Sequence, residues 1–426
     1  MLNRTIPPAI YAPTSFEFRL PPCSKQWLDN GIPLYYVNDC VEEVAQVELV
    51  FPAGLWYESK IGVAQAAMSL LKSGTSQWSS FQINEMFEQY GASVKTAAGN
   101  DWASVSISCL TKHLSKLLPI ISTLLQDAVF PEHELEIYKQ NTKQRLAIQL
   151  KKSNFVANRA IDTYLFGKQH PYGKYSEMAD VDAITREDLH YHVQQFITLS
   201  SCKIFLAGKF TNHELSAINA TFGKSILQPA TLEQPKYLVS NAVEKKYRIT
   251  NDPNGVQGSI RLIRSFPDKH HPDFTPMIVL NTVFGGYFGS RLMSNIREEK
   301  GYTYGIHSYL YNNVHDGAFI ITTEAGKDVC EETIQEIYYE MEMLRQQKMD
   351  QEELQLVKNY LLGTILGDLD GAFQIIQRWK NIILNGFEED RFYKNIEVYK
   401  NISPDELQHL ANVYLQKDDF YELVVV

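Results

Sequence analysis

One order of predicted elements occurs twice along this chain of 426 residues. In each half, two strands, two helices and two further strands precede a long amphipathic helix, and a capped helix and a final strand close the set. Corresponding elements lie roughly 210–220 residues apart, and self-similarity at that scale indicates duplicated domains. The chain is therefore expected to fold as two similar halves.

Hydrophobic periodicity predicts the class of each half. Residues 102–109 alternate small or apolar residues with serines, which is typical of a strand with one buried face. Residues 112–128 and 328–345 keep apolar side chains at helical spacing, and Thr185 and Ser403 each begin a capping-box sequence. This pattern predicts an α+β class, with helices layered on one face of a mostly antiparallel sheet.

Four segments follow from this organisation. Residues 1–25 hold five prolines and are expected to form an extended N-terminal arm. Residues 26–223 and 244–426 are the two predicted domains. Residues 224–243 contain two prolines and little periodicity, so they are expected to form a linker.

Composition excludes several classes of partner. The net charge of −10 argues against nucleic acid and anionic membrane surfaces, and no apolar run approaches membrane-spanning length. Five scattered cysteines without metal-type spacing indicate reduced thiols, and the N-terminus lacks the apolar core of a signal peptide. A cytoplasmic protein is expected.

The most distinctive local sequence is a glycine-rich turn in the second half, which consists of Gly285, Gly286, Gly289, Ser290 and Arg291. The paired glycines are expected to end a helix by taking positive φ, and the serine is expected to cap the next helix. A glycine at 301 then ends that helix. The tyrosines at 302 and 304 are predicted on one face of the strand that follows.

Arg297 and Tyr304 are the candidate binding residues of this stretch. An arginine at a helix end, seven residues before a strand tyrosine, places a fork of N–H donors beside a phenol. This pairing suits the backbone or the carboxylate of an extended peptide. Residue types alone leave an alternative open, in which Arg297 forms a surface ion pair and Tyr304 packs in the core.

The sequence from Gly285 to Tyr304 resembles the C-terminal half of the pitrilysin, insulysin and mitochondrial processing peptidase family, the inverted-motif zinc metallopeptidases. His170-Pro171-Tyr172-Gly173 and Gly74-Thr75 are further points of similarity, and the resemblance covers about residues 28–426. It implies two duplicated domains of the processing-peptidase-like (LuxS/metallohydrolase-like) type that face each other across a peptide-binding chamber. It also implies that Arg297 and Tyr304 contact the substrate backbone near the scissile bond.

The zinc motif of that family is degenerate in this chain. Active members carry His-x-x-Glu-His nine residues before the Gly-Thr pair, where this sequence has Gln65, Met68 and Ser69. Amide, thioether and hydroxyl groups bind Zn²⁺ poorly, and the register of the third ligand falls near Val156 or Ala160. No metal site is expected in this chain.

No other catalytic signature replaces it in the sequence. His190 and His192 are expected on a solvated helix face, because side chains two residues apart on a helix point about 200° apart and cannot chelate one ion. No Ser-His-Asp, Cys-His, Walker or dinucleotide-binding pattern is present.

The resemblance therefore implies a non-catalytic, substrate-binding subunit of a heterodimeric zinc peptidase that acts on extended peptides. A homologous partner would supply the zinc and the catalytic base, and this chain alone would be inactive and hold no cofactor. The predicted edge strand at residues 92–98 could add a peptide strand. A homodimer of the isolated chain stays open, as does a purely structural or peptide-binding protein with no role in proteolysis.

Overall fold

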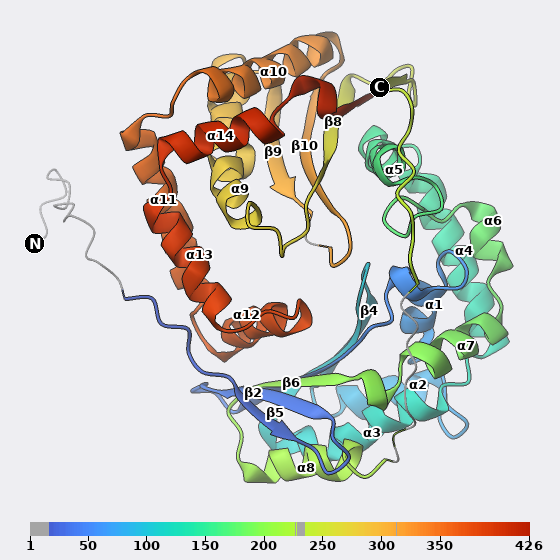
Figure 1. Cartoon of the computed structure of the whole chain (residues 1–426). Coiled ribbons are helices and arrows are strands. Elements are labelled where there is room, and N and C mark those ends of the chain that lie inside the picture. Colours follow the sequence, from blue (N-terminus) through green and yellow to red (C-terminus); the bar gives the residue numbers. More distant parts are fainter. Residues whose placement is uncertain (1–16, 226, 228–234, 312) are drawn as a thin grey trace, which may run out of the picture.

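The computed structural model describes residues 17–225, 227, 235–311 and 313–426. It contains two sheets with the same topology (Figure 1). The first has the strand order β1-β2-β6-β3-β5-β4. Its strands are β1 (Ser24–Trp27), β2 (Pro33–Asn38), β3 (Val44–Phe51), β4 (Ser93–Ala98), β5 (Ala103–Leu110) and β6 (Lys203–Gly208).

The second sheet has the order β7-β11-β8-β10-β9, which reproduces the order of the last five strands of the first. One pair in each sheet is parallel, β2 with β6 and β7 with β11, and the other pairs are antiparallel. The predicted duplication and the α+β class are confirmed. These strands are β7 (Lys246–Ile249), β8 (Gln257–Phe266), β9 (Thr303–Leu310), β10 (Gly317–Gly326) and β11 (Tyr421–Val425).

The helices repeat in the same order. The N-terminal half contains α1 (Val63–Leu70), α2 (Ser80–Glu88), α3 (Leu114–Asp127), α4 (Glu132–Gln149), α5 (Ser153–Phe166), α6 (Met178–Ala183), α7 (Arg186–Phe196) and α8 (Asn212–Phe222). The C-terminal half contains α9 (Phe274–Asn281), α10 (Cys330–Gln346), α11 (Gln351–Gly367), α12 (Ala372–Leu384), α13 (Asp390–Asn401) and α14 (Pro404–Tyr414), with π-helical turns η4 (Thr282–Gly286) and η5 (Met293–Glu299).

Both predicted capping boxes are present and open equivalent helices. The Thr185 hydroxyl accepts from the backbone N–H of Asp188 at 3.3 Å at the start of α7. The Ser403 hydroxyl accepts from the backbone N–H of Glu406 at 3.2 Å at the start of α14. In each box the acidic side chain also accepts from the backbone N–H of the cap residue, so two otherwise unpaired amides are satisfied.

The two halves exchange one helix each, which the sequence pattern did not predict. Helix α5 packs against β8 and β11 of the other half, and α12 packs against β2 and β6 (Figure 1). Each helix contributes apolar side chains to a shared core, such as Ile161 with Leu423 and Ile375 with Phe205. Helices therefore cover both faces of each sheet, and the expected single-face arrangement is wrong.

The N-terminal arm also links the halves. Phe18 and Leu20 are buried in the core of the C-terminal half, and the Trp379 indole donates to the Pro21 carbonyl at 2.8 Å. Residues 1–16 of the predicted arm, and residues 226 and 228–234 of the predicted linker, lie outside the described residues. Within the described part, no helix is both long and apolar enough to cross a membrane.

His192 does not lie on a solvated helix face, as the sequence suggested. Its side chain is 0% exposed, and its Nε2 lies 3.1 Å from the Ala53 carbonyl oxygen. Burial lowers the pKa of His192 to about 4, so the imidazole is neutral near pH 7. His190 is only partly buried and packs edge-on against Phe130. The pattern failed because His192 shares the buried face of α7 with Leu189 and Val193.

Candidate functional site

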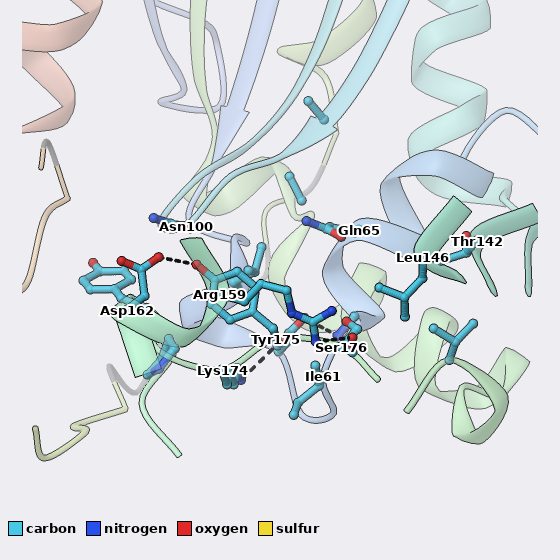
Figure 2. Close-up of a pocket in the computed structure, with 18 of the residues that line it drawn as sticks. Ile61, Gln65, Asn100, Thr142, Leu146, Arg159, Asp162, Lys174, Tyr175 and Ser176 are labelled. Carbon is cyan, nitrogen blue, oxygen red and sulfur yellow. Dashed lines mark hydrogen bonds and ion pairs between the residues drawn. The ribbon is translucent and has the colours of Figure 1, made fainter. Parts of the chain in front are cut away.

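A cavity of about 1070 Å³ lies where the halves meet, and the three degenerate zinc positions line it. Figure 2 shows one of them, Gln65, together with other residues of the lining. Gln65, Met68 and Ser69 come from α1, and Ala97 and Ala98 come from the end of β4. The C-terminal half contributes the end of β9 and the loop after it. Because β4 is an edge strand, no strand in the described part of the chain pairs with its outer backbone groups.

The sequence of α1 explains why two polar residues face the cavity. Gln65 and Ser69 are the exposed residues of α1, and they share one face at a spacing of four. The helix begins after Gly62, whose φ of +88° favours glycine. The Glu58 carboxylate accepts from the Gly62 and Ala64 amides at 3.0 and 3.3 Å, and it pairs with Lys174 at 3.3 Å. The N-terminal end of α1, the helix that carries the degenerate zinc positions, is therefore held in place by hydrogen bonds from its amides to Glu58.

The residues around Gln65 and Ser69 do not form a zinc site. The neighbouring helix α4 lines the cavity with Thr142, Arg145, Leu146 and Gln149. Val156 and Ala160, the predicted third-ligand positions, pack instead against the core shared with the C-terminal sheet. Among the described residues, no group of three or more His, Cys, Asp or Glu could hold a metal ion. The donor set present does not fit zinc.

Asp162 of α5 lies in the wall of the cavity, and no sequence motif points to it. Its carboxylate accepts from the hydroxyl of Tyr311 at 2.5 Å and from the hydroxyl of Tyr175, so it joins the two halves at the cavity wall (Figure 2). Burial raises the pKa of Asp162 to about 6, against the opposing effect of the two hydroxyl donors.

The His-Pro-Tyr-Gly segment forms a second link between the halves. His170 Nε2 lies 3.1 Å from an Asp316 carboxylate oxygen, and the Tyr172 hydroxyl donates to Asp101. The backbone N–H of Val314 donates to the same Asp101 carboxylate at 3.1 Å. This segment, a further point of the family resemblance, therefore holds the loop after β9, and with it one end of the cavity.

Arg297 and Tyr304 are adjacent, as their spacing suggested, and they are accessible. The Arg297 guanidinium lies 4.5 Å from the ring centre of Phe288 and 5.6 Å from that of Tyr304. The Tyr304 side chain is 92% exposed, so it does not pack in the core. Within the described part of the chain, Arg297 forms no ion pair.

A β-bulge directs Tyr304 outward. Between the paired residues Thr303 with Ala325 and Ile306 with Thr323, β9 has one more residue than β10, so Tyr304 and Gly305 both oppose Glu324. The Thr303 hydroxyl donates to the Glu324 carbonyl at 2.6 Å and accepts from the Gly305 amide at 3.1 Å, which stabilises the bulge.

The bulge changes which face of β9 carries Tyr304. Ile306 and Ser308 are buried on the side that packs against η4 and η5, and regular alternation would place Tyr304 with them. The extra residue reverses this, so Tyr304 is exposed like Tyr309. Tyr302 precedes the strand and packs partly buried against the C-terminal core, and the expectation of one shared face is wrong.

The glycine-rich turn is built by close packing rather than by positive φ. Neither Gly285, Gly286 nor Gly289 has positive φ, which corrects the prediction. A Cβ atom on Gly285 would lie 2.6 Å from Ser308 Oγ and 3.0 Å from its amide nitrogen, so glycine is needed where η4 touches β9. Gly301, in contrast, has a φ of +67° and ends η5 as expected.

The two polar residues of the glycine-rich turn, Ser290 and Arg291, have structural roles. Ser290 precedes the helical residues, but its hydroxyl is buried and caps nothing among the described residues, so the predicted side-chain cap is wrong. Arg291 forms a bidentate ion pair with Glu353 of α11, at 2.8 and 2.7 Å. This ion pair connects the turn to α11. Arg291 is therefore engaged with Glu353, and the arginine beside Tyr304 is Arg297.

The Arg297–Tyr304 pair and the cavity are separate places in this chain. Neither residue lines the cavity, whereas Tyr309, five residues further along β9, does. At the rise of a β-strand, Tyr304 and Tyr309 are roughly 15–17 Å apart. The pair therefore lies outside the cavity that contains the degenerate zinc positions.

Two sequence profiles of one peptidase family match this chain. The profile described as insulinase, peptidase family M16, matches residues 34–170, and the one described as peptidase M16 inactive domain matches residues 183–361. The chain is 21% identical over 365 residues to the uncharacterized zinc protease YmxG of Bacillus subtilis, covering 84% of this chain and 87% of that protein. It is 22% identical over 346 residues to the non-peptidase homolog YmxG of Helicobacter pylori, covering 78% and 77%.

Solved structures share the whole fold. A peptidase M16 inactive domain structure from Pseudomonas fluorescens aligns with a TM-score of 0.84 at 20% identity, covering 95% of this chain and 98% of that one. A protease from Helicobacter pylori aligns with a TM-score of 0.86 at 14% identity, covering 96% and 100%. A chain of complex III from Candida albicans aligns with a TM-score of 0.75 at 13% identity, covering 94% and 95%.

Proposed function

Because this chain belongs to peptidase family M16, we propose that it is the non-catalytic, substrate-binding subunit of a two-chain zinc peptidase. A homologous partner with His-x-x-Glu-His supplies the zinc site, and this chain supplies Arg297 and Tyr304. The observation that carries the proposal is the position of this pair. Tyr304 is exposed, Arg297 is half-buried beside it, and neither residue lines the cavity of this chain.

Preorganisation supports a binding role for the pair. The guanidinium is held against two aromatic rings, so less side-chain freedom is lost when it binds a ligand. A β-bulge and a π-helical turn, η5, present the two residues, and such irregular elements occur frequently at functional sites.

Exposed apolar side chains around the pair support a protein partner. Phe288 is 63% exposed, and Leu356 and Tyr360 are exposed on one face of α11. Tyr360 contacts Tyr287 of the glycine-rich turn, with ring centres 4.8 Å apart, so these residues belong to one region of the surface. Exposed aromatic and aliphatic groups of this kind favour burial against another chain.

The proposed division of labour follows from the chemistry of the two groups. The Arg297 fork donates to a backbone carbonyl of an extended peptide, and the Tyr304 hydroxyl donates to the carbonyl oxygen on which charge develops. A zinc ion held by the partner would supply the activation of the attacking water. The pair thus orients the peptide and stabilises charge without itself transferring a proton.

The proposal is tested by mixing this chain with its nearest His-x-x-Glu-His relative and a fluorogenic peptide library. Cleavage is expected in the mixture and not with this chain alone, and the purified complex is expected to hold one zinc per two chains. An inert mixture in which a complex still forms would favour the structural role instead. If the relative cleaves equally well alone, this chain has no part in catalysis.

A further inference from the structure

Two guanidinium groups of the cavity have no carboxylate partner among the described residues. Arg145 Nη2 donates to the Thr142 hydroxyl at 3.4 Å, and Arg159 Nη2 donates to the Ser176 carbonyl at 2.9 Å. Both acceptors are neutral. Because a guanidinium has five N–H donors, most donors of each side chain remain available to a ligand.

The acidic groups that line the cavity are already engaged. Glu58 accepts from two backbone amides and pairs with Lys174. Asp162 accepts from two tyrosine hydroxyls, and burial raises its pKa to about 6. The lining of the cavity holds three basic side chains, Arg145, Arg159 and Lys174, against these two acidic ones, inside a chain whose net charge is −10.

Two carboxylates also lie near Arg159, and one further polar donor lines the cavity. Glu177 and Asp180 lie close enough to influence Arg159, but neither forms an ion pair with it in the described structure. Asn313 Nδ2 is buried and lacks a hydrogen-bond partner within the described residues, although Asn313 Oδ1 accepts from Asn100 at 2.9 Å. A buried N–H donor without a partner indicates a place for an acceptor.

Arg159 crosses the middle of the cavity, with Asp162 on one side and Gln65 and Leu146 on the other (Figure 2). Arg145, on α4, lies close enough to Tyr138 for its positive charge to favour ionisation of the tyrosine hydroxyl, and Tyr138 also lies beside Ser69. The two guanidinium groups thus approach the degenerate zinc face from two helices. The cavity of about 1070 Å³ is large enough for several residues of a peptide.

We propose that this cavity binds a carboxylate of an extended peptide, with Arg145 and Arg159 as the charged donors. A planar guanidinium matches the two oxygens of a carboxylate, and a low-dielectric wall strengthens the attraction. The carboxylate is that of an acidic side chain or of the peptide C-terminus, which offer the same acceptor. The inference rests on the proposed function only in taking a peptide as the ligand.

Fluorescence anisotropy with the isolated full-length chain tests the proposal. The probes are labelled eight-residue peptides in three forms: a central Glu with an amidated C-terminus, a central Gln with an amidated C-terminus, and a central Gln with a free C-terminus. At least one carboxylate form is expected to bind about 10-fold or more tightly than the neutral form. Which of the two binds identifies the source of the carboxylate, and added salt should weaken that binding.

Three variants make the test specific. Arg145→Gln and Arg159→Gln are each expected to weaken carboxylate binding by about 10- to 100-fold and to leave neutral binding unchanged. Arg19→Gln makes the same charge change at an exposed position outside the cavity and should have no effect. Arg145 is exposed on α4, so Arg145→Gln should fold normally. This variant keeps the test valid even if Arg159→Gln, which loses the hydrogen bond to the Ser176 carbonyl, disturbs the fold.

Equal binding of the three peptides, no binding by any, or indifference to both cavity variants would overturn the inference. Because this assay uses one chain and no cleavage, those outcomes leave the mixing experiment unaffected. Failure of the mixed chains to cleave, with carboxylate binding intact, would reject the peptidase role alone.

Discussion

Replacing Arg297 with alanine is expected to lower the kcat of the mixed peptidase by roughly 10²- to 10³-fold, the effect of removing one preorganised donor that acts on the transition state. The guanidinium lies against Phe288 and Tyr304 and forms no ion pair within the described structure, so its removal leaves no carboxylate there without its partner. The zinc content and the formation of the complex should be unchanged. Steady-state kinetics of the purified pair measures this.

Matched variants separate the hydroxyl of Tyr304 from its ring. Tyr304→Phe keeps the ring beside Arg297 and removes only the donor, so a large loss of kcat would assign the effect to the hydroxyl. Tyr339→Phe makes the same change at an exposed position on α10, outside the cavity, and should have little effect on cleavage. Equal losses in the two phenylalanine variants would contradict the special role of Tyr304.

Replacing Asp162 with alanine is expected to lower the free energy of unfolding by about 2–5 kcal/mol. The carboxylate accepts from Tyr175 in one half and Tyr311 in the other, and its removal leaves two largely buried hydroxyls without a partner. Urea denaturation monitored by circular dichroism measures the change. Asp162→Asn preserves the shape and can pair with both hydroxyls, so it should cost much less.

The same residue gives a pH dependence with a definite sign. The pKa of Asp162 is raised from 3.8 to about 6 by burial, so the unfolded chain ionises first as pH rises. Its contribution to stability is therefore full below pH 3.8 and is lost as pH rises through about 6. Asp162→Asn cannot ionise. The stability of wild type relative to this variant should fall over that range, and an opposite trend would contradict the assignment.

The duplicated fold could be predicted because it rests on local signals. Alternating strands, amphipathic helices and the capping boxes at Thr185 and Ser403 depend on neighbouring residues, and their repetition reveals two halves. The exchange of α5 and α12 between halves could not be predicted in this way. Both helices are flanked by polar residues in sequence, and which sheet they cover depends on contacts between distant segments.

The candidate site was partly predictable for the same reason. Spacing and family resemblance selected Arg297, Tyr304 and the degenerate positions on α1. The bulge at Tyr304 has no comparable signal, because an extra residue in β9 becomes visible only from its register with β10. Asp162, Arg145 and Arg159 were missed because isolated charged residues on helices are usually solvated. Their positions emerge only where α4 and α5 meet the second half.

Photo-crosslinking from position 288 tests most directly whether this chain reaches a partner's active site. Phe288 is 63% exposed beside Arg297, and p-benzoylphenylalanine can replace it without removing either residue of the pair. In the complex with a zinc-bound, uncleaved peptide analogue, the account predicts crosslinks to the peptide near its scissile bond or to the partner's zinc helix. Crosslinks confined to this chain, or unchanged when the partner is left out, would contradict it.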